Sequence, residues 1–314
     1  MNGRNSTMPA TVIIDCDPGN DDAIALLLAL ASPEIEVAAI TVVAGNVGLD
    51  HTARNARAVA ELARHPVPVY AGAVKPLLRP PLDAAHIHGE TGLKGAELPA
   101  PVRALGPGTA ADFLRATLRA AAPRSVTLCA LGPLTNLALA LAIEPAIAAG
   151  IARIVLMGGA IGLGNTSPAA EFNMIADPHA AAIVFAAGVP IVMVPIDLTH
   201  QAIATGPRVA AIRATGTASA AFAAALMTAY PAREKFAFAG GPVHDACAVA
   251  WLVRPDLMHG RDCRVAIDTG EGPSRGRTLV DWWGRRETPN ALVLNHIDAD
   301  GFFELLRERL ARLP

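Results

Sequence analysis

A cluster of four aspartates at residues 15–22 constrains this chain more than any other feature. The β-branched residues 12–14 before the cluster predict a short buried strand, and the alanines and leucines of residues 23–30 after it favour a helix. Residues 18–20, Pro-Gly-Asn, then form the turn between the two elements. Two aspartates leave the carboxyl end of the strand, and two lie at the helix N-terminus, where negative charge is favoured. All four should therefore converge on one small volume: Asp15, Asp17, Asp21 and Asp22.

Four carboxylates cannot all remain ionised in one small volume unless a positive charge joins them. Like charges raise one another's pKa, and burial adds a desolvation cost. A hard divalent cation is the simplest remedy, and oxygen ligands favour Ca²⁺ or Mg²⁺ over zinc or copper. Cys16 is the one softer ligand within the cluster. The alternative is an acidic turn that only caps the helix, although a single aspartate would suffice for a cap.

Short β-rich runs alternate with runs rich in alanine and leucine as far as Thr199. Buried apolar strands separated by helices predict an α/β fold, a mainly parallel, Rossmann-like open sheet with helices on both faces. Because no Ser/Gly-rich linker or charge block divides residues 1–314, we expect a single large domain. The expected strands are residues 12–14, 36–43, 67–70, 125–130, 151–157 and 190–196, and the expected helices are residues 23–30, 52–64, 109–121, 136–143 and 177–187.

Two segments are expected to be irregular. Residues 76–101 are rich in proline and glycine, carry His86 and His88, and are too long for an ordinary connection, so we interpret them as a functional loop. Residues 160–175 form the second irregular segment. After Thr199 we expect alanine-rich helices through Tyr230 and at residues 245–253, strands at residues 263–267, 278–282 and 291–295, packing roles for Trp282 and Trp283, and a closing helix at residues 300–312.

The carboxyl ends of the parallel strands are the expected place for the active site. In open parallel sheets, ligands bind in the crevice outside these strand ends. Residues 131–133 and 157–159 and Asp197 follow other expected strands at the same edge. We therefore expect these segments to be neighbours of the aspartate cluster.

Charge and hydropathy argue against two classes of partner. A net charge of −2 and a pI near 6.5 offer no basic surface for a nucleic-acid backbone. Residues 1–11 lack the apolar core of a signal peptide, and glycine and proline interrupt the longest apolar stretch, residues 180–196, so no membrane association is expected. Four widely spaced cysteines without a CxxC pair predict reduced thiols in a cytoplasmic protein: Cys16, Cys129, Cys247 and Cys263.

A set of motifs spread along the chain resembles one known family. They are D-C-D-P-G-N-D-D at residues 15–22, G-P-L-T-N at 132–136, M-G-G at 157–159, E-F-N at 171–173 and V-H-D-A-C at 243–247. In this order they resemble the motifs of the nucleoside hydrolases, the inosine-uridine-preferring family that cleaves the N-glycosidic bond of ribonucleosides. The resemblance covers nearly the whole chain, and it also implies a homodimer or homotetramer.

The resemblance implies a Ca²⁺ site and a nucleoside site that share a cavity. The Ca²⁺ ligands would be Asp17, both oxygens of Asp22, the backbone carbonyl of Leu131 and Asp245. The ribose 2′- and 3′-hydroxyls and one water would complete a shell of oxygens, which suits Ca²⁺. The residues implied to bind the nucleoside are Asp21 and Asn173 at the ribose diol, Asn165 and Glu171 at the 5′-hydroxyl side, Asn46 at the sugar, and Met157 and His88 facing the substrate.

The chemistry of glycosidic cleavage fits this set. Cleavage builds positive charge on C1′ and the ring oxygen, and a carboxylate-rich pocket stabilises that charge. A divalent cation would acidify a bound water, Asp17 would take its proton as the catalytic base, and His244 would protonate the leaving base as the catalytic acid. Taken alone, however, His244-Asp245 before an apolar helix also fits an N-terminal cap.

Substrate preference is predicted from the region before His244. Residues 229–236 resemble the pyrimidine-preferring branch, and His244 argues against the branch specialised for purines alone. Where some family members carry tyrosines, this chain has Thr228 and Ala232, with Tyr230 between them. We predict uridine and cytidine as substrates, extending to inosine.

Two other functions remain open. A haloacid-dehalogenase-type sugar phosphatase also places Asp-x-Asp after a buried strand, but its pattern has Thr or Val where this chain has Gly19. A non-catalytic nucleoside- or ribose-binding protein would use the same site without a competent acid or base. Release of phosphate would identify the first, and an absence of turnover would identify the second.

Overall fold

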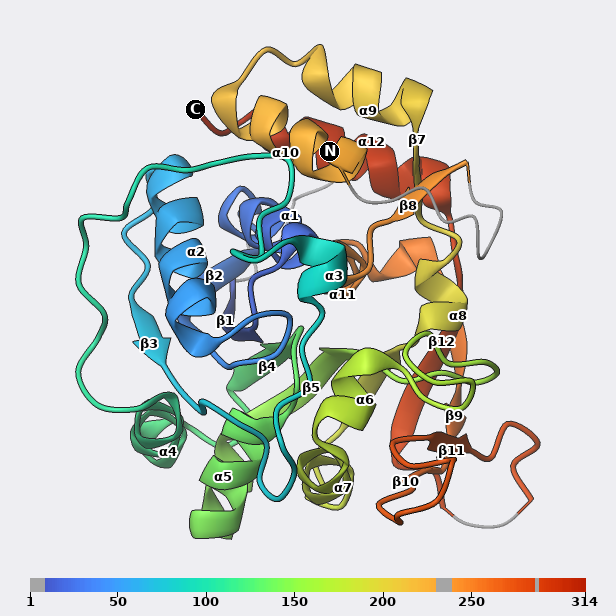
Figure 1. Ribbon diagram of the computed structural model, residues 1–314. Helices are drawn as coiled ribbons and strands as arrows, with labels where there is room; N and C mark the ends of the chain where they lie inside the picture. The colour runs from blue at the N-terminus through green and yellow to red at the C-terminus, as the bar shows by residue number, and fades with distance from the viewer. Residues whose placement is uncertain (1–8, 230–238, 286–287) are drawn as a thin grey trace, which may run out of the picture.

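An eight-stranded sheet forms the centre of the computed structural model, which describes residues 9–229, 239–285 and 288–314 (Figure 1). Its strands pair in parallel except at one edge, where β9 runs antiparallel to β12. The predicted α/β fold with a mainly parallel sheet is therefore confirmed. In spatial order the strands are β3 (Val69–Ala71), β2 (Ile35–Val42), β1 (Ala10–Cys16), β4 (Val126–Ala130), β5 (Ile151–Met157), β6 (Ile191–Val194), β12 (Ala291–Ile297) and β9 (Met258–Cys263).

Neighbouring side chains of β1 enter two different hydrophobic cores. Val12 and Ile14 belong to the core on one face of the sheet, and Ile13 belongs to the core on the other face. Successive side chains of a strand point to opposite faces, so a sheet that is covered on both faces is apolar at every position. This is why the central strands show unbroken apolar runs instead of an alternation of polar and apolar residues.

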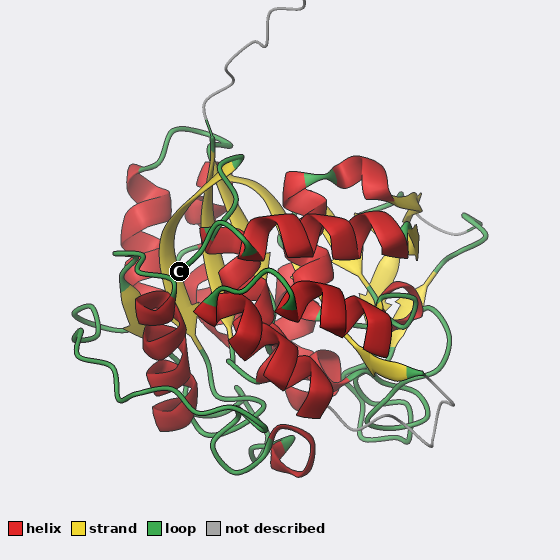
Figure 2. Cartoon of the chain, turned by 90° about the horizontal axis from the view of Figure 1, so that it is seen from above, coloured by secondary structure: helices red, strands yellow, loops and turns green. Residues whose placement is uncertain are grey.

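Two helical layers supply the other halves of these cores. One layer lies above the sheet in Figure 1 and over the strands in Figure 2, and the second lies below the sheet in Figure 1. The upper layer comprises α1 (Asn20–Leu30), α2 (Leu49–Leu62), α9 (Gly206–Arg213), α10 (Ala218–Ala229), α11 (Asp245–Val253) and α12 (Ala299–Leu310), and the lower layer comprises α4 (Ala110–Ala120), α5 (Thr135–Ile143) and α7 (Pro178–Phe185).

Shorter elements complete the described chain. Two small antiparallel pairs stand apart from the main sheet. The remaining elements are α3 (Ala85–His88), α6 (Phe172–Ala176), α8 (Ile196–Thr199), the pair β7 (Ile203–Thr205) and β8 (Gly240–Pro242), the pair β10 (Val265–Ile267) and β11 (Thr278–Val280), and 3₁₀ turns at Pro145–Gly150 and Pro255–Leu257.

Helices α1 and α11 are apolar around most of their circumference and are buried accordingly. Both begin at the same end of the sheet and carry carboxylates in their first turns, Asp21 and Asp22 on α1 and Asp245 on α11. The positive end of a helix dipole favours such charges. The packing of two buried helices thus brings acidic groups together that are more than 200 residues apart in the sequence.

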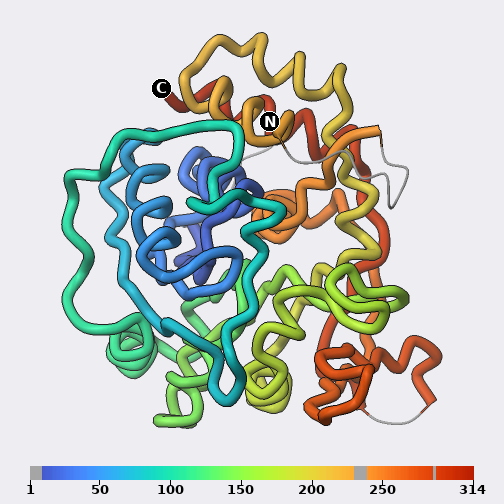
Figure 3. Tube along the Cα trace, in the orientation of Figure 1, coloured from blue at the N-terminus to red at the C-terminus, as the bar shows by residue number. Residues whose placement is uncertain are grey.

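The long connection between β3 and α4 crosses the front of the molecule, where it carries α3, and then follows the left edge (Figure 3). It is anchored to the core by amide side chains. Asn20 accepts a hydrogen bond from the Lys94 amide at 2.9 Å and donates to the Lys94 carbonyl at 3.1 Å, and Asn55 donates to the Thr91 carbonyl at 2.7 Å. The segment predicted as an irregular loop is thus largely irregular, and these bonds hold it beside the aspartate cluster.

Several sequence predictions for the carboxyl-terminal part were wrong in detail. The strand expected at residues 278–282 ends at Val280, and the one expected at 263–267 is divided between β9 and β10. Trp282 packs partly buried against the core, with the Arg261 guanidinium 5.2 Å from its ring centroid, as expected for a packing residue. Trp283, however, is 76% exposed and does not pack.

The second segment expected to be irregular contains α6, which is only five residues long and has no apolar periodicity to indicate it.

Other predictions fared better or fall outside the described residues. The four cysteines are free and buried, which confirms the expectation of reduced thiols. Among the described residues, no helix is long and apolar enough to cross a membrane. Tyr230 and Ala232, with most of the segment 229–236, lie outside the described residues.

Asp177 joins three segments below the sheet. Its buried carboxylate accepts hydrogen bonds from the Leu77 amide at 2.9 Å, the Thr135 hydroxyl at 2.8 Å and the Ala180 amide at 3.1 Å. It therefore caps α7 and at the same time holds the loop that leads to α3. A buried acceptor shared in this way stabilises the fold because each donor would otherwise be left unsatisfied.

Asp177→Asn should lower the free energy of unfolding by about 1–3 kcal/mol, because the amide nitrogen cannot accept the bonds that one carboxylate oxygen accepts now. Urea denaturation measures this change. Asp50→Asn, at an exposed aspartate in the first turn of α2, is the control and should stay within about 0.5 kcal/mol of the unaltered protein. Equal effects of the two substitutions would contradict the role given to Asp177.

Candidate active site

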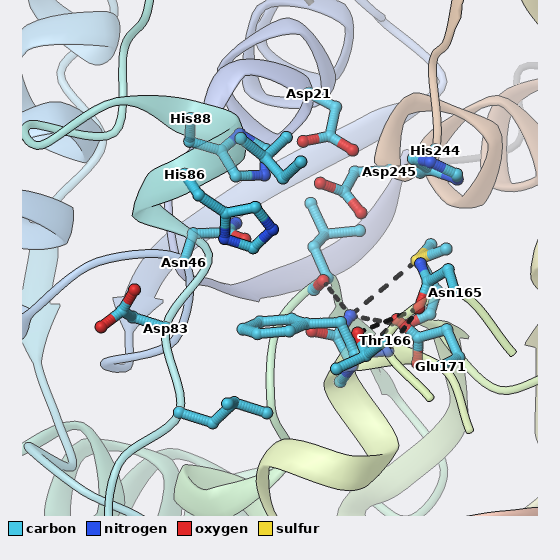
Figure 4. Close-up of a pocket in the computed structure, with 16 residues that line it drawn as sticks. Asp21, Asn46, Asp83, His86, His88, Asn165, Thr166, Glu171, His244 and Asp245 are labelled. Atoms are coloured by element: carbon cyan, nitrogen blue, oxygen red, sulfur yellow. Dashed lines mark hydrogen bonds between the residues drawn. The ribbon is translucent and has the colours of Figure 1, made fainter. Parts of the chain in front are cut away.

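A cavity of about 420 Å³ opens at the carboxyl ends of the central strands (Figure 4). Segments that are distant in the sequence line it, including the first turns of α1 and α11, the loop around α3, the ends of β4 and β5, and the region of α6. The rule that ligands bind outside the carboxyl ends of parallel strands thus holds. The lining residues are Asp21, Asn46, Leu82, Asp83, His86, Ile87, His88, Leu131, Met157, Asn165, Thr166, Glu171, Phe172, Asn173, His244 and Asp245.

Asp22 is the most constrained carboxylate of the cluster. It is 0% exposed and accepts hydrogen bonds from the backbone amides of Asp17 at 3.2 Å and Gly19 at 3.0 Å. The Asn46 side-chain amide adds a third bond at 3.1 Å. Asp22 therefore does cap the turn before α1, as the simplest interpretation of an acidic turn requires. That interpretation leaves the other buried aspartates unexplained.

Asp17 has a buried oxygen without a partner. Its Oδ2 accepts the Asn46 backbone amide at 2.7 Å, whereas its Oδ1 has no hydrogen-bond partner among the described residues. The backbone packs so closely against this carboxylate that a Cβ atom at Gly45 or Gly132 would collide with it. An unsatisfied carboxylate oxygen in such a position is costly unless a ligand or a proton joins it.

The structure brings three carboxylates into one possible metal site. Ligand atoms of Asp21, Asp22 and Asp245 all lie within 4.8 Å of one another. Figure 4 shows the carboxylates of Asp21 and Asp245 turned toward each other. Asp22 and Asp245 are also close enough for a hydrogen bond between their side chains, which requires a proton because ionised carboxylates only accept. A cation at this position would remove the need for that proton, so the donor set fits a hard divalent metal.

Burial and mutual repulsion disturb the ionisation of the whole cluster. Burial, followed by the charge of Asp22, raises the pKa of Asp21 to about 7. The same two causes raise the pKa of Asp17 well above its ordinary value. Burial and the charges of Asp21 and Asp22 raise the pKa of Asp245 well above its ordinary value. Without a cation, the protein would therefore retain protons here at neutral pH.

Asp15 lies beneath the site and serves to position it. Its Oδ1 accepts bonds from the Thr41 hydroxyl at 2.5 Å and from the Asn136 side chain at 2.8 Å. Burial raises the pKa of Asp15 to about 7, although these two hydrogen bonds oppose the shift. Asn136 also donates to the Val42 carbonyl at 3.1 Å and accepts from the Ala73 amide at 2.8 Å. Asp15 thus ties β1 to β2 and to the start of α5.

Glu171 lies on the opposite side of the cavity from α3 (Figure 4) and forms a polar corner with Asn173, whose backbone amide it accepts. Glu171 accepts backbone amides of Gly159 and Asn173, both at 2.9 Å, and is 2% exposed. Burial raises its pKa to about 7 against these bonds. Asn173 donates to the carbonyls of Leu131 at 2.7 Å and Met157 at 3.1 Å. Its side-chain oxygen is therefore oriented by two strand ends.

Two histidines line the cavity and are held by different contacts. His88 is 6% exposed, and its Nδ1 accepts the backbone amide of Asn20 at 3.1 Å. His244 directly precedes α11, yet its side chain makes no capping hydrogen bond to that helix, and its Nδ1 lies 2.7 Å from the Thr199 hydroxyl. A cap alone therefore does not explain His244. His86, by contrast, is exposed at the mouth of the cavity.

Most of the predicted site residues meet at this cavity. Asp17 and Asp22 lie just beneath it, at 1% and 0% exposure, and the others line its wall. Asn165 lines it as well, and its side-chain oxygen accepts the Phe172 amide at 3.0 Å. Asp197, expected as a neighbour, instead holds the segment after β5 by accepting the amides of Ile161 and Gly162.

Sequence reasoning missed several residues of the site. Thr199 contacts His244 but follows an ordinary apolar strand and belongs to no motif that indicated a role. Phe172 lies inside the E-F-N motif and could have been found there. The remaining wall residues come from the loop around α3 and from residue 166, where single side chains in irregular segments give no pattern: Leu82, Asp83, Ile87 and Thr166.

Comparison with known proteins identifies the class to which this fold and cavity belong. A family model described as inosine-uridine preferring nucleoside hydrolase matches residues 12–304. The chain therefore belongs to the inosine-uridine preferring nucleoside hydrolase family and is a nucleoside hydrolase. This membership favours glycosidic cleavage over the phosphatase and the non-catalytic binding protein as its function.

Individual relatives match over nearly their full length. The chain is 46% identical over 311 residues to the pyrimidine-specific ribonucleoside hydrolase RihA of Citrobacter koseri, covering 97% of this chain and 99% of that one. It is 48% identical over 308 residues to an uncharacterised protein of Schizosaccharomyces pombe, covering 96% and 99%. The solved purine-preferring ribonucleoside hydrolase from Gardnerella vaginalis superimposes with a TM-score of 0.89 at 32% identity, covering 96% and 98%.

Removal of divalent metal should make stability depend on pH in a defined direction. The pKa values of Asp15, Asp21 and Glu171 are raised to about 7 in the folded state. A carboxyl group whose pKa is raised by folding binds its proton more tightly in the folded state. Its contribution to stability is fully present below the pKa of about 4 that it has in the unfolded chain, and it is lost as the pH rises through the folded pKa of about 7. In a chelator, the thermal midpoint should therefore fall between pH 4 and pH 8.

Adding back a divalent cation, for example Ca²⁺, at pH 8 should restore that stability, by about 2.7 kcal/mol at a hundredfold excess over its dissociation constant. Asp245→Asn should abolish most of the gain, whereas Asp256→Asn, at an exposed aspartate paired with Arg254, should preserve it. Thermal unfolding with and without Ca²⁺ measures both effects. A calcium gain that survives in Asp245→Asn unchanged would show that the cation binds elsewhere.

Proposed function

We propose that this chain hydrolyses the N-glycosidic bond of ribonucleosides in a Ca²⁺-dependent reaction, with uridine and cytidine as preferred substrates and inosine as a further one. The observation that carries the proposal is the single cavity in which buried carboxylates, the Asn173 amide and His244 meet. Family membership supports the reaction. The proposed partner is thus a small nucleoside, and the test is the release of ribose and free base from a panel of ribonucleosides.

We propose Asp17, Asp22, Asp245 and the carbonyl of Leu131 as the Ca²⁺ ligands. The unsatisfied Oδ1 of Asp17 and the close approach of Asp22 to Asp245 support this set. The carbonyl oxygen of Leu131 already accepts a hydrogen bond from the Asn173 side chain, but its second lone pair remains available for a cation. When bound, Ca²⁺ would neutralise the cluster, hold the ribose diol and lower the pKa of a water.

The protein groups around the diol would hold the ribose in place. Asp21, which is 7% exposed, can accept hydrogen bonds from a hydroxyl, and Asn173 presents a side-chain oxygen fixed by its two donated bonds. Glu171 and Asn165 would face the 5′-hydroxyl, and Asn46 would face another part of the sugar. Met157 would contact the substrate from the wall of the cavity. Several hydrogen bonds would fix the ring, so that little reorganisation is needed as charge develops on C1′.

Asp17 is the proposed general base. It lies beneath the cavity, and its Oδ2 accepts a backbone donor, so Oδ1 would have to both contact the cation and, through its second lone pair, take a proton from an attacking water. The proposed cation beside Asp17 would keep its carboxylate ionised and therefore able to accept that proton. The carboxylates around it would also stabilise the positive charge of the oxocarbenium-like transition state.

His244 is the proposed general acid for the leaving base. It stands beside Asp245 at the wall of the cavity, so its position is tied to the same helix end as the ribose site. His88 approaches from α3 on another side. In its neutral form His88 carries its proton on Nε2, because Nδ1 accepts from Asn20, and it would therefore donate to the substrate.

The preference for pyrimidines rests on the relatives. The C. koseri relative at 46% identity is named pyrimidine-specific, whereas the G. vaginalis structure at 32% identity is named purine-preferring. The higher identity favours pyrimidine nucleosides for this chain. A comparison of kcat/KM for uridine, cytidine, inosine and adenosine tests the order.

We also propose a homo-oligomer in the cytoplasm. The four free, buried cysteines suit a reducing compartment. Leu279 and Trp283, at 51% and 76% exposure, are apolar side chains that a second copy could cover in a dimer or tetramer. The mass of the protein in solution, compared with 32.4 kDa for one chain, tests the second part.

The diol model predicts discrimination against 2′-deoxyuridine. Loss of one hydroxyl would leave buried polar groups of the site unpaired, which typically reduces kcat/KM by about 10⁴-fold. The measurement is the rate of base release from uridine and from 2′-deoxyuridine at equal concentration. Comparable rates would rule out a diol held by the cation.

Asp17→Asn keeps the shape of the side chain but removes the proposed base and one metal charge. Turnover of uridine should fall by at least about 10²-fold, the usual worth of general base catalysis, while the fold persists. Steady-state kinetics and circular dichroism measure the two parts. Asp50→Asn, at an exposed residue that does not line the cavity, should keep the normal rate. Near-normal turnover in Asp17→Asn would exclude Asp17 as the base.

His244→Ala should separate leaving-group chemistry from ribose chemistry. Uridine cleavage should slow by roughly 10²–10⁴-fold, because the departing base loses its acid. A 4-nitrophenyl riboside should keep most of its rate, because its phenolate leaves without a proton. If both substrates lose rate equally, His244 supports the metal site through Asp245 and is not the acid.

A further inference from the structure

Thr199 lies in direct contact with the proposed acid. Its hydroxyl oxygen is 2.7 Å from Nδ1 of His244, across 45 positions of sequence. Thr199 is 0% exposed and His244 is 7% exposed, so the contact is largely shielded from water. The ring of His200 packs beside that of His244, with 5.6 Å between centroids. The residues at the end of α8 therefore contact the His244 ring and fix its position.

The contact decides which nitrogen of His244 can serve the substrate. The two ring nitrogens point in different directions, and Nδ1 is committed to Thr199. Nε2 is consequently the nitrogen that can transfer a proton to a leaving base. A substitution of Thr199 that removes this hydrogen bond would allow the His244 ring to adopt other rotamers. Nδ1 and Nε2 would then no longer have fixed and different positions.

The backbone near Thr199 allows its hydroxyl oxygen to act as the acceptor in this hydrogen bond. The carbonyl of Ile196, one turn earlier, lies 3.5 Å from the Thr199 oxygen and can accept its hydrogen. In that arrangement the Thr199 oxygen accepts a proton from Nδ1–H of His244. The same bond then exists when His244 is doubly protonated and when Nε2 has lost its proton.

We propose that Thr199 is the positioning residue of His244, holding its ring by Nδ1 so that the protonated Nε2 faces the leaving base. This inference rests on the acid role proposed for His244. During cleavage the Nε2 proton moves to the base, the N–H bond breaks, and His244 remains as the neutral tautomer that carries its proton on Nδ1. Thr199 accepts from Nδ1 before and after the transfer, so the step needs no rearrangement of the protein.

The test compares Thr199→Val, which keeps the shape but lacks the hydroxyl, with Thr199→Ser, which keeps the hydroxyl. Thr199→Val should lower kcat for uridine by roughly 10- to 100-fold, the worth of a hydrogen bond to a charged group, with little change in KM. Its rate on a 4-nitrophenyl riboside should stay within about threefold of the unaltered protein's, because no acid is needed there. Thr199→Ser should recover most of the uridine rate.

Three results would overturn the proposal. The first is an equal loss of rate on uridine and on the 4-nitrophenyl riboside in Thr199→Val, and the second is no loss of rate on uridine in that variant. The third is a Thr199→Ser variant as slow as Thr199→Val, which would assign the effect to packing of the methyl group. A measurement without turnover is the ¹⁵N resonance of His244, assigned by its absence in His244→Gln. We expect Nδ1 to be protonated in the unaltered protein and the tautomer populations to change in Thr199→Val.

The two hypotheses can fail separately. If the unaltered protein cleaves no ribonucleoside, the proposed function fails, while the ¹⁵N spectrum still reports whether Thr199 holds Nδ1–H. If uridine is cleaved and His244→Ala affects both substrates equally, the acid role fails and the positioning role fails with it. If His244→Ala shows the expected split and Thr199→Val does not, only the role of Thr199 is wrong.

Discussion

Repulsion among buried carboxylates is the constraint on which the rest of this structure depends. Asp17, Asp22 and Asp245 are almost fully shielded from water, and their pKa values are raised, chiefly by burial. Such a cluster is tolerable only if protons or a cation compensate it. The surrounding architecture then has a clear purpose, because rigid strand ends and helix N-termini hold groups together that would otherwise separate.

Hydrogen bonds behind the cavity wall explain how that rigidity is achieved. Below the cluster, Asp15 accepts hydrogen bonds from Thr41 and Asn136. Asn46 donates hydrogen bonds to both Asp17 and Asp22. Glu171 accepts hydrogen bonds from backbone amides of the turn after β5 and of α6. These bonds link strands β1 and β2, helices α1, α5 and α6, and the loops after β2 and β5. A nucleoside would therefore meet a site that is already formed, and the chemistry would depend on Asp17 and His244 placed on separate structural supports.

The sequence predicted the parts of the site that are local or repeat a motif. The aspartate cluster, the strand before it and the helix after it are contiguous, so β-branched and helix-forming residues were sufficient to place them. The parallel sheet followed from apolar runs that alternate with helices. Thr199 was not predicted, because its contact with His244 arises from packing between segments with no shared pattern. Trp283 was misjudged because an apolar side chain does not reveal whether a neighbour covers it.

The most direct measurement of the central claim is a crystal structure of the protein grown with Ca²⁺, recorded at a wavelength where calcium scatters anomalously. We expect one strong peak coordinated by Asp17, Asp22, Asp245 and the carbonyl of Leu131, at about 2.3–2.6 Å from each oxygen. No peak at this position, or a peak from which Asp17 is excluded, would contradict it.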